Sequence, residues 1–365
     1  MMRIAFYGSS LLSSYRNSAA TYYRGLLRNL ACRGYDITFY EPDDGERQRH
    51  RDIDSPGWCQ SVVYPPTADG VRSVVADAAR AEIVIKASGV GVFDNELLAG
   101  LLATARPDAV RLYWDVEAPA TLQQIRCNDL HPLRQALPQL DGVMTNGGGP
   151  PVAAAYTALK ARRCMPVYNG FDPVTHHPAQ AEQRFAGDLG FLGNRLPDRN
   201  ARAEEFFLRP AKLMPERRFM LGGAGWGDKW VPPNVMKLGH IQTSEHNAFN
   251  RSCLAVLSVA REGMAAAGFS PSARIFEAAG AGACLITDHW EGIGYFLKPG
   301  QHILIARDGQ DVAEHLEHLT PQQAKEIGLR ALEHVLMHHT YANRAADVDA
   351  MLQSEFQRKR ETAAA

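Results

Sequence analysis

The feature that most constrains the fold is an alternation of short apolar runs with helix-like segments, which occurs twice along the chain. The first half contains apolar runs at 3–9, 36–42, 81–89, 109–115 and 141–149, most of them separated by segments with helical spacing. Each run ends in small or polar residues. Strands that alternate with helices form βαβ units, so this half predicts a parallel sheet.

The second half repeats the pattern after a break. Residues 166–190 contain "PVYNGFDPVTHHPAQ", which has three prolines, an Asn-Gly pair and no periodicity. Further apolar runs follow at 187–194, 217–225, 234–241, 254–260, 283–288 and 302–307. Since 365 residues exceed what one hydrophobic core usually serves, two domains are expected.

We therefore predict an α/β protein with two Rossmann-like domains facing a cleft. The expected boundaries are an N-terminal domain at 1–172, a linker at 173–186 and a C-terminal domain at 187–340. Residues 341–365 are expected to form a helix that packs back on the N-terminal domain. Ligands of parallel sheets bind beyond the carboxyl ends of the strands, so polar residues after strands are the candidates for chemistry.

Composition excludes several classes of function. The net charge is −1, from 39 basic and 40 acidic residues, so no global field attracts nucleic acid or an anionic membrane. No apolar run approaches the ~20 residues of a membrane-spanning helix, and the N-terminus does not read as a signal peptide. The six cysteines form no Cys-x-x-Cys pair, which favours reduced thiols. A cytoplasmic location is expected.

The stretch "SPSARIFEAAGAGACLITD" at 270–288 is the most informative local pattern. Ser270 suits a helix cap and Pro271 a first turn, and the start of a helix attracts anions. Arg274 and Glu277 are three residues apart and share a helix face. The pattern fits a nucleotide diphosphate held by backbone and arginine, with its ribose hydroxyls on the glutamate. The alternative is a simple Arg–Glu surface pair.

Three segments carry a family resemblance. "RIFEAAGAGACLITD" resembles the donor-binding segment of glycosyltransferases of the GT-B fold. "PVYNGFDPVTHHP" resembles the connection that closes the first domain in retaining family 4 members. "GFSPSARIFEA" and "HHTYANRA" resemble the CgeB-like, spore-maturation branch of that superfamily. The resemblance implies an acceptor-side N-terminal domain and a C-terminal domain that binds a nucleotide-sugar.

The resemblance also implies site residues in the second half. The residues expected to hold the donor diphosphate are Arg195, Arg199, Ser270, Ser272 and Arg274. Glu277 is expected on the ribose, and His240 and Ile241 near the base. The family's first glutamate, eight positions before the second, falls on Phe269. Phenylalanine accepts no hydrogen bond, which leaves the sugar, the stereochemistry and the activity open.

Two sites are expected in the first half. Gly8 and Ser9 follow the first strand, where they either contact donor or acceptor or form an ordinary turn. Asp115 ends the strand at 109–115. It is expected to orient a sugar hydroxyl or act as a base on the acceptor. The alternative is an aspartate that caps the next helix.

The resulting expectation is a hexosyltransferase-type enzyme that moves a sugar from a UDP-, GDP- or dTDP-sugar to an unknown glycan, lipid, protein or small-molecule acceptor. The rivals are a sugar-nucleotide epimerase of the same fold and a silent nucleotide-sugar or glycan binder. No Asp-x-Asp motif is present, and in the pairs His176-His177 and His338-His339 neighbouring side chains point apart. We therefore expect no cofactor and no required metal.

Overall fold

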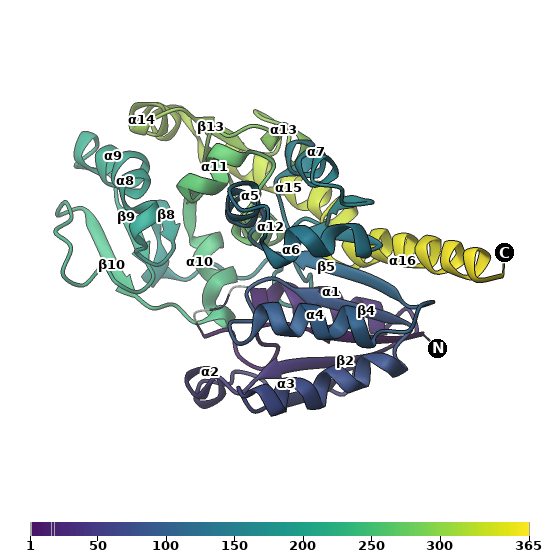
Figure 1. Cartoon of the computed structure of the whole chain (residues 1–365). Helices are drawn as coiled ribbons and strands as arrows, with labels where there is room; N and C mark the ends of the chain where they lie inside the picture. The colour runs from purple at the N-terminus through teal and green to yellow at the C-terminus, as the bar shows by residue number, and fades with distance from the viewer. Residues whose placement is uncertain (1, 16, 18, 365) are drawn as a thin grey trace. The chain divides into compact units, whose positions relative to one another are not determined.

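The computed structural model describes residues 2–15, 17 and 19–364, and the chain divides into two compact units (Figure 1). Unit 1 comprises Met1–Tyr168 and Tyr341–Ala365, and unit 2 comprises Asn169–Thr340. Residues 173–186, expected as a linker, belong to unit 2. The C-terminal segment belongs to unit 1.

The described part of unit 1 is built on a seven-stranded parallel sheet with the order β3-β2-β1-β4-β5-β6-β7. Its strands are β1 (Met2–Tyr7), β2 (Tyr35–Pro42), β3 (Gln60–Tyr64), β4 (Ile83–Ala87), β5 (Val110–Asp115), β6 (Gly142–Thr145) and β7 (Cys164–Pro166). Its helices are α1 (Ala19–Ala31), α2 (Gly45–Arg49), α3 (Ala68–Val75), α4 (Asp94–Thr104), α5 (Ala118–Arg126), α6 (Pro132–Ala136), α7 (Gly149–Ala158) and α16 (Tyr341–Ala364), with 3-10 turns at Ala76–Arg80 and Leu137–Gln139.

Successive strand residues of unit 1 serve two different cores, as the pleat requires. In β1, Ile4 and Phe6 pack with the apolar residues of α1 and α16. Ala5 and Tyr7 face the other side and pack with α3 and α4. Because both faces of the sheet are covered, its strands read as nearly continuous apolar runs.

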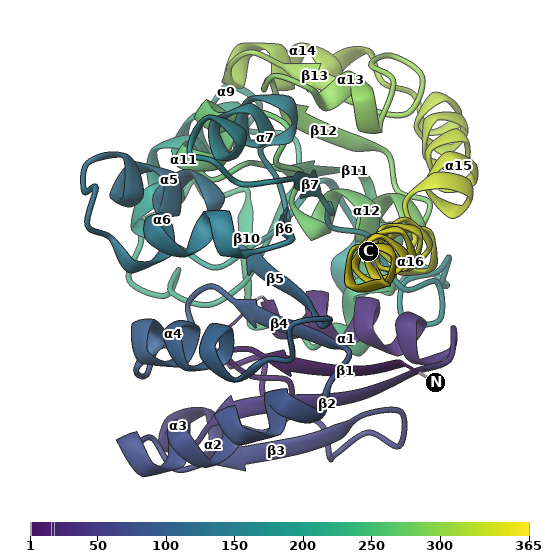
Figure 2. The ribbon, with the colours of Figure 1, turned by 45° about the vertical axis from the view of Figure 1, so that its right-hand side comes forward.

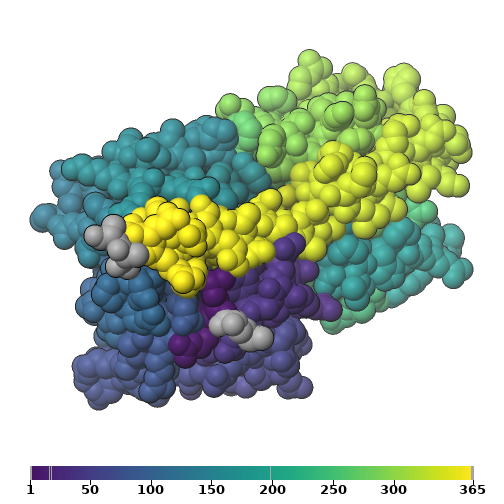
Figure 3. Space-filling model, turned by 90° about the vertical axis from the view of Figure 1, so that its right-hand side faces the viewer, coloured from purple at the N-terminus to yellow at the C-terminus, as the bar shows by residue number. Residues whose placement is uncertain are grey.

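Helix α16 completes one face of unit 1 although it follows unit 2 in the chain. Tyr341, Ala345, Val348 and Leu352 lie in the same core as α1. Figure 2 shows α16 close to end-on beside α1, and Figure 3 shows it lying along the N-terminal residues. At the start of α16 the approach is close, since a Cβ atom at Gly25 would lie 2.2 Å from the Tyr341 ring.

The described part of unit 2 contains a six-stranded parallel sheet with the order β10-β9-β8-β11-β12-β13. Its strands are β8 (Gly187–Leu192), β9 (Phe219–Gly222), β10 (Val235–Gly239), β11 (Cys253–Ser258), β12 (Leu285–Asp288) and β13 (Leu304–Ala306). Its helices are α8 (Asn200–Ala203), a π-helical turn (Glu204–Leu208), α9 (Arg209–Leu213), α10 (His246–Ser252), α11 (Glu262–Ala267), α12 (Ala273–Gly280), α13 (Ile293–Phe296), α14 (Gly309–His318) and α15 (Pro321–His338), with 3-10 turns at Gln183–Phe185, Pro197–Arg199 and Thr243–Glu245.

Unit 2 also has a core on each face of its sheet. Phe191 and Leu221 pack among the apolar residues of α8, α9, α14 and α15. Met220 faces the other side and packs against Phe249 of α10. This arrangement places α10 and α12 next to the strand ends that the sequence predicts to carry the site.

The predicted fold class is confirmed, with two strands that the sequence patterns do not reveal. The apolar runs of both halves form parallel strands, whereas β3 and β7 fall in segments for which the sequence predicts no strand. The six cysteines are all free; Cys59 and Cys284 are buried, whereas Cys32 and Cys127 are exposed. None of the helices in the described ranges is long and apolar enough to cross a membrane.

Candidate functional site

The loop that precedes α12 holds an unusual backbone conformation. Gly268 and Phe269 both have positive φ angles, of 67° and 43°, and a bulky residue rarely adopts the latter. The Phe269 N–H donates to the Glu291 carbonyl at 2.7 Å, and a Cβ atom at Gly292 would lie 2.4 Å from the Phe269 ring. The Phe269 ring, at the position where the resemblance implies a glutamate, is therefore packed into the loop itself.

Helix α12 starts two residues later than predicted. Its N-cap residue is Ser272, not Ser270, and the Ser272 hydroxyl makes no capping hydrogen bond. That hydroxyl lies 3.4 Å from the hydroxyl of Ser258, the last residue of β11. Ser270 is buried, and its hydroxyl donates to the Gly268 carbonyl at 2.8 Å. Arg274 is therefore the second residue of α12.

Arg274 and Glu277 do not form the surface ion pair that was the alternative to a donor site. The Arg274 guanidinium lies 3.4 Å from Nδ1 of His246, the first residue of α10. Among the described residues, no hydrogen bond or ion pair engages the Glu277 carboxylate, which is partly buried. An unpaired carboxylate and a guanidinium therefore share one face of α12.

Two buried histidines complete a cluster with Glu277. One ligand atom each of His176, His246 and Glu277 lies within 4.8 Å of the other two. The two imidazole rings lie side by side, with centroids 6.4 Å apart and planes at 30°. Sequence reasoning misses both residues as site members. His176 and His177 are adjacent, so their side chains point apart and they do not suit a pair of ligands to one ion. No local sequence pattern indicates His246.

Both histidines are kept neutral by their surroundings. Burial, followed by the positive charge of Arg274, lowers the pKa of His246 to about 4. Burial also lowers the pKa of His176, although the Glu277 carboxylate opposes that shift. Nε2 of His246 faces the Ile241 carbonyl at 3.3 Å, so in the neutral ring Nε2 carries the proton and Nδ1 presents a lone pair.

The segment that carries His176 is tied to both neighbouring helices. The Asn247 side chain of α10 donates to the Thr175 carbonyl at 2.8 Å. The Asn169 amide donates to the Pro271 carbonyl at 3.0 Å, just before α12. Phe171 packs so closely on α12 that a Cβ atom at Gly280 would lie 2.5 Å from its ring. Gly280 thus serves this close approach of a neighbouring segment.

The predicted phosphate-binding arginines lie beyond the carboxyl end of β8 and are engaged with the protein. Arg195 forms an ion pair with Asp228 at 3.2 Å. The Arg199 guanidinium donates to the Asn194 carbonyl and lies 5.8 Å from the Phe191 ring. A guanidinium has five N–H donors, so each of these side chains keeps donors beyond the contacts described.

Arg202, one turn further along, was not predicted and has a structural partner. It forms an ion pair with Asp288, which is completely buried at the end of β12. Asp288 also accepts the Ala260 N–H at 2.9 Å. This pair connects α8 to the strand ends near the predicted site.

The predicted base-binding pair separates into an exposed and a buried residue. His240 is exposed, and the structure gives its side chain no hydrogen bond within the described chain. Ile241 is buried, and its carbonyl holds His246. Of the residues around 240, Ile241 is thus the one linked to the histidine cluster.

The predicted residues of unit 1 are held by hydrogen bonds within that unit. Gly8 donates its N–H to the Tyr40 carbonyl at 3.0 Å, and a Cβ atom there would lie 2.5 Å from the Phe39 ring. The Ser9 hydroxyl accepts a hydrogen bond from Asn17 at 3.1 Å. These contacts favour the ordinary turn that was the alternative for Gly8 and Ser9.

Asp115 is completely buried at the carboxyl end of β5. Its carboxylate accepts the Glu117 N–H at 2.9 Å, the Thr121 hydroxyl at 3.0 Å and the Tyr156 hydroxyl. Burial raises the pKa of Asp115, and these hydrogen bonds oppose the shift. A carboxylate so enclosed favours a structural role over a base that meets an acceptor, although the N-cap residue of α5 is Glu117 and not Asp115.

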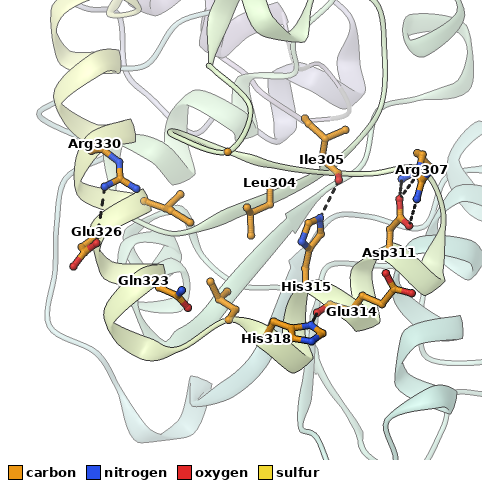
Figure 4. Close-up of a pocket in the computed structure, with 13 residues that line it drawn as sticks. Leu304, Ile305, Arg307, Asp311, Glu314, His315, His318, Gln323, Glu326 and Arg330 are labelled. Carbon is orange, nitrogen blue, oxygen red and sulfur yellow. Dashed lines mark hydrogen bonds and ion pairs between the residues drawn. The ribbon is translucent and has the colours of Figure 1, made fainter.

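A cavity of about 670 Å³ in unit 2 lies away from these residues, between β13, α14 and α15 (Figure 4). Four of its charged groups form two ion pairs, Arg307 with Asp311 at 2.6 Å and Arg330 with Glu326 at 4.0 Å. His315 contacts the Ile305 carbonyl at 2.9 Å. None of the predicted donor-binding residues lines this cavity.

The two parallel sheets, with polar residues gathered at the strand ends of the second, define an α/β protein of the GT-B type. Residues 199–350 match the family model described as glycosyl transferase-like, and this match includes α12 and the whole of "SARIFEAAG". No curated protein sequence matches the chain.

Several solved structures are similar over nearly the whole chain. Sucrose-phosphate synthase from Thermosynechococcus elongatus has a TM-score of 0.70 and 12% identity, covering 98% of this chain and 100% of that one. Anabaena HepE in complex with UDP-glucose has a TM-score of 0.66 and 14% identity, with coverages of 97% and 100%. A trehalose 6-phosphate synthase from Burkholderia multivorans has a TM-score of 0.66 and 12% identity, with coverages of 99% and 98%. At these identities the likeness establishes the fold.

Proposed function

We propose that the protein is a glycosyltransferase that moves a sugar from a nucleotide-sugar to an acceptor hydroxyl. The observation that carries the proposal is the face of α12, where Arg274 and an unpaired Glu277 lie within the matched glycosyl transferase-like region. An ordinary surface pair would have joined these two side chains. Their separation leaves a cation for phosphates and a carboxylate for hydroxyls.

The donor contacts divide between these two side chains. The Arg274 guanidinium stabilises the charge that grows on the leaving diphosphate as the glycosidic bond breaks. The Glu277 carboxylate accepts hydrogen bonds from the two ribose hydroxyls. Arg195 and Arg199 are proposed to offer the diphosphate the N–H donors that their contacts with Asp228 and Asn194 do not use.

The donor class and the branch of the family are parts of the same proposal. Solved neighbours hold UDP or UDP-glucose, so uridine diphosphate sugars are the first donors to test. We place the chain in the CgeB-like branch related to retaining family 4, on the segments "GFSPSARIFEA" and "HHTYANRA". Transfer is proposed to need no metal, because Arg274 supplies the positive charge that a metal would otherwise supply.

Calorimetric titration of two variants tests the donor site. Arg274→Ala is expected to weaken UDP binding by about 10- to 150-fold, since a charge-assisted hydrogen bond is worth ~1.5–3 kcal/mol. Uridine binding should change little, because uridine has no phosphate. Glu277→Gln is expected to weaken the binding of uridine more than that of 2′-deoxyuridine, because the latter already lacks one of the two hydroxyls. Lys325→Ala and Glu333→Gln, at exposed positions of α15, are the matched controls.

The same titrations can refute the site, and turnover separates enzyme from binder. Arg274 would be structural if Arg274→Ala loses equal affinity for UDP and uridine. Glu277 would be structural if Glu277→Gln loses equal affinity for uridine and 2′-deoxyuridine. Release of UDP from UDP-glucose, with or without an acceptor, is expected of the wild type. Binding without any release would favour a silent nucleotide-sugar binder, which the packed ring of Phe269 also suggests.

A further inference from the structure

His176, His246 and Glu277 come from three different elements and present two imidazole nitrogens and a carboxylate oxygen to one point. His176 lies in the segment after β7, His246 begins α10 and Glu277 lies on α12. Two imidazoles and one carboxylate are a ligand set of zinc and related first-row transition ions, with a fourth position left for water or another ligand.

His246 is oriented as a metal-ligating histidine usually is. A ligating imidazole normally donates its other N–H to a carbonyl or carboxylate, which fixes the tautomer. Nε2 of His246 faces the Ile241 carbonyl at 3.3 Å, so the free lone pair is on Nδ1. His176 is 6% exposed, and its Nε2 has no hydrogen-bond partner among the described residues. A buried nitrogen without a partner is costly unless something binds it.

The distances require only small side-chain movements. Ligand atoms around a tetrahedral ion lie ~3.4 Å apart when each is ~2.1 Å from the ion. The observed spread is up to 4.8 Å, so closure takes rotations of the three side chains. The supporting backbone is held in place by the hydrogen bonds from Asn247 to Thr175 and from Asn169 to Pro271.

Arg274 is the group that opposes an ion here. Its guanidinium lies 3.4 Å from Nδ1 of His246, a contact longer than an ordinary hydrogen bond. An ion on Nδ1 displaces this contact, and the guanidinium's positive charge weakens ion binding. Arg274 is partly exposed, so its side chain can turn away. Arg274 therefore sets the affinity without occupying the ligand positions.

We propose that His176, His246 and Glu277 form a binding site for a divalent transition-metal ion such as Zn²⁺, and that this ion and the donor ribose exclude each other. The exclusion rests on the proposed function, because both ligands need the Glu277 carboxylate. The ion is then an inhibitor of donor binding rather than a participant in transfer. The metal site itself stands on the geometry alone.

The metal site is tested on tag-free full-length protein, dialysed against a chelator and titrated with Co²⁺. We expect one ion per chain with the visible absorption of a four- or five-coordinate Co²⁺ site, and its displacement by Zn²⁺. His176→Ala and His246→Ala should each weaken binding at least 10-fold. His177→Ala and His240→Ala, at exposed neighbouring histidines, should leave it unchanged.

Arg274→Met separates this site from adventitious binding. Removing the opposing charge should increase the affinity for Co²⁺. Replacing an arginine with a purely structural role would not have this effect. Three outcomes would each overturn the metal site. The wild type does not bind Co²⁺, or His177→Ala loses as much Co²⁺ affinity as His176→Ala, or Arg274→Met binds Co²⁺ with unchanged affinity. Circular dichroism of every variant identifies loss of folding, and the tightening in Arg274→Met keeps the test decisive if both histidine variants misfold.

Displacement of bound Co²⁺ by uridine tests the exclusion. Uridine is used because it lacks the phosphates that would bind the ion in solution. The Co²⁺ absorption should fall as uridine is added, and more weakly with 2′-deoxyuridine. Retained absorption at saturating uridine overturns the exclusion while leaving the metal site intact. If Glu277→Gln also binds uridine normally, the donor-site assignment fails with it.

Discussion

Replacing Gly280 with alanine tests the close packing that positions His176. A Cβ atom at Gly280 would lie 2.5 and 2.6 Å from two ring carbons of Phe171, and 3.3 Å from the His176 carbonyl. Carbon atoms pack best at ~3.5–4.0 Å, so the ring must retreat by ~1 Å. Phe171 is 1% exposed, so its ring is surrounded by protein.

The expected cost follows from two opposing effects. Overpacking a core costs ~1–3 kcal/mol, whereas alanine is favoured over glycine within a helix by ~1 kcal/mol. The clash should win, because both the ring and the backbone of its segment are held. A net loss of ~1–2 kcal/mol lowers the melting temperature by about 2–8 °C in a unit of this size.

Scanning calorimetry of Gly280→Ala beside Gly263→Ala measures this effect. Gly263 lies in α11, and a Cβ atom there would have nothing within 4 Å, so this control keeps the helix preference without the clash. Gly263→Ala should be neutral or slightly stabilising. Because Phe171 and His176 share one segment, Gly280→Ala should also weaken Co²⁺ binding. A Gly280→Ala protein as stable as the control would refute the packing argument.

Two further outcomes are expected in unit 2. Arg202→Ala leaves the fully buried Asp288 without its ion-pair partner and should cost ~3 kcal/mol in urea unfolding, with partial recovery in the double variant that adds Asp288→Asn. Burial lowers the pKa values of His302 and His334, so the unfolded chain binds protons more readily than the folded protein. The free energy of unfolding, measured with a chelator present, should therefore be constant above pH ~7 and fall as the pH drops below ~6.5. His302→Gln should flatten that decline, and an unchanged slope would contradict it.

The fold is well predicted by the sequence because parallel strands buried on both faces carry a strong local signal. β12 is an apolar run closed by Asp288, and such runs can be read without knowing their partners. β3 and β7 escape prediction for a physical reason. They are the edge strands of their sheet, and β7 has only three residues and includes Pro166. An edge strand needs fewer apolar residues, so its pattern is weak.

The site is predictable only as far as it is local. Arg274 and Glu277 share a helix face, and their three-residue spacing is enough to indicate it. His176 and His246 are 70 positions apart, and only the folding of α10 beside the segment after β7 brings them together. Asp115 shows the opposite limit. Its position after a strand suggests chemistry, but its enclosure by Tyr156 and Thr121 depends on packing that no spacing reveals.

The assignment of α16 to unit 1 has a consequence for how the protein is made. The sheet of unit 1 is fully synthesised once β7 ends at Pro166, yet the helix that covers one of its faces begins only at Tyr341. At ~5–20 residues per second, a ribosome needs about 9–35 s to cross that interval. During that time the apolar surface awaiting Ala345, Val348 and Leu352 is bare, while all of unit 2 is being completed. We therefore expect chaperones to bind the nascent N-terminal half. Truncation of the chain before Tyr341 would destabilise unit 1, because one face of its sheet would lose a covering helix.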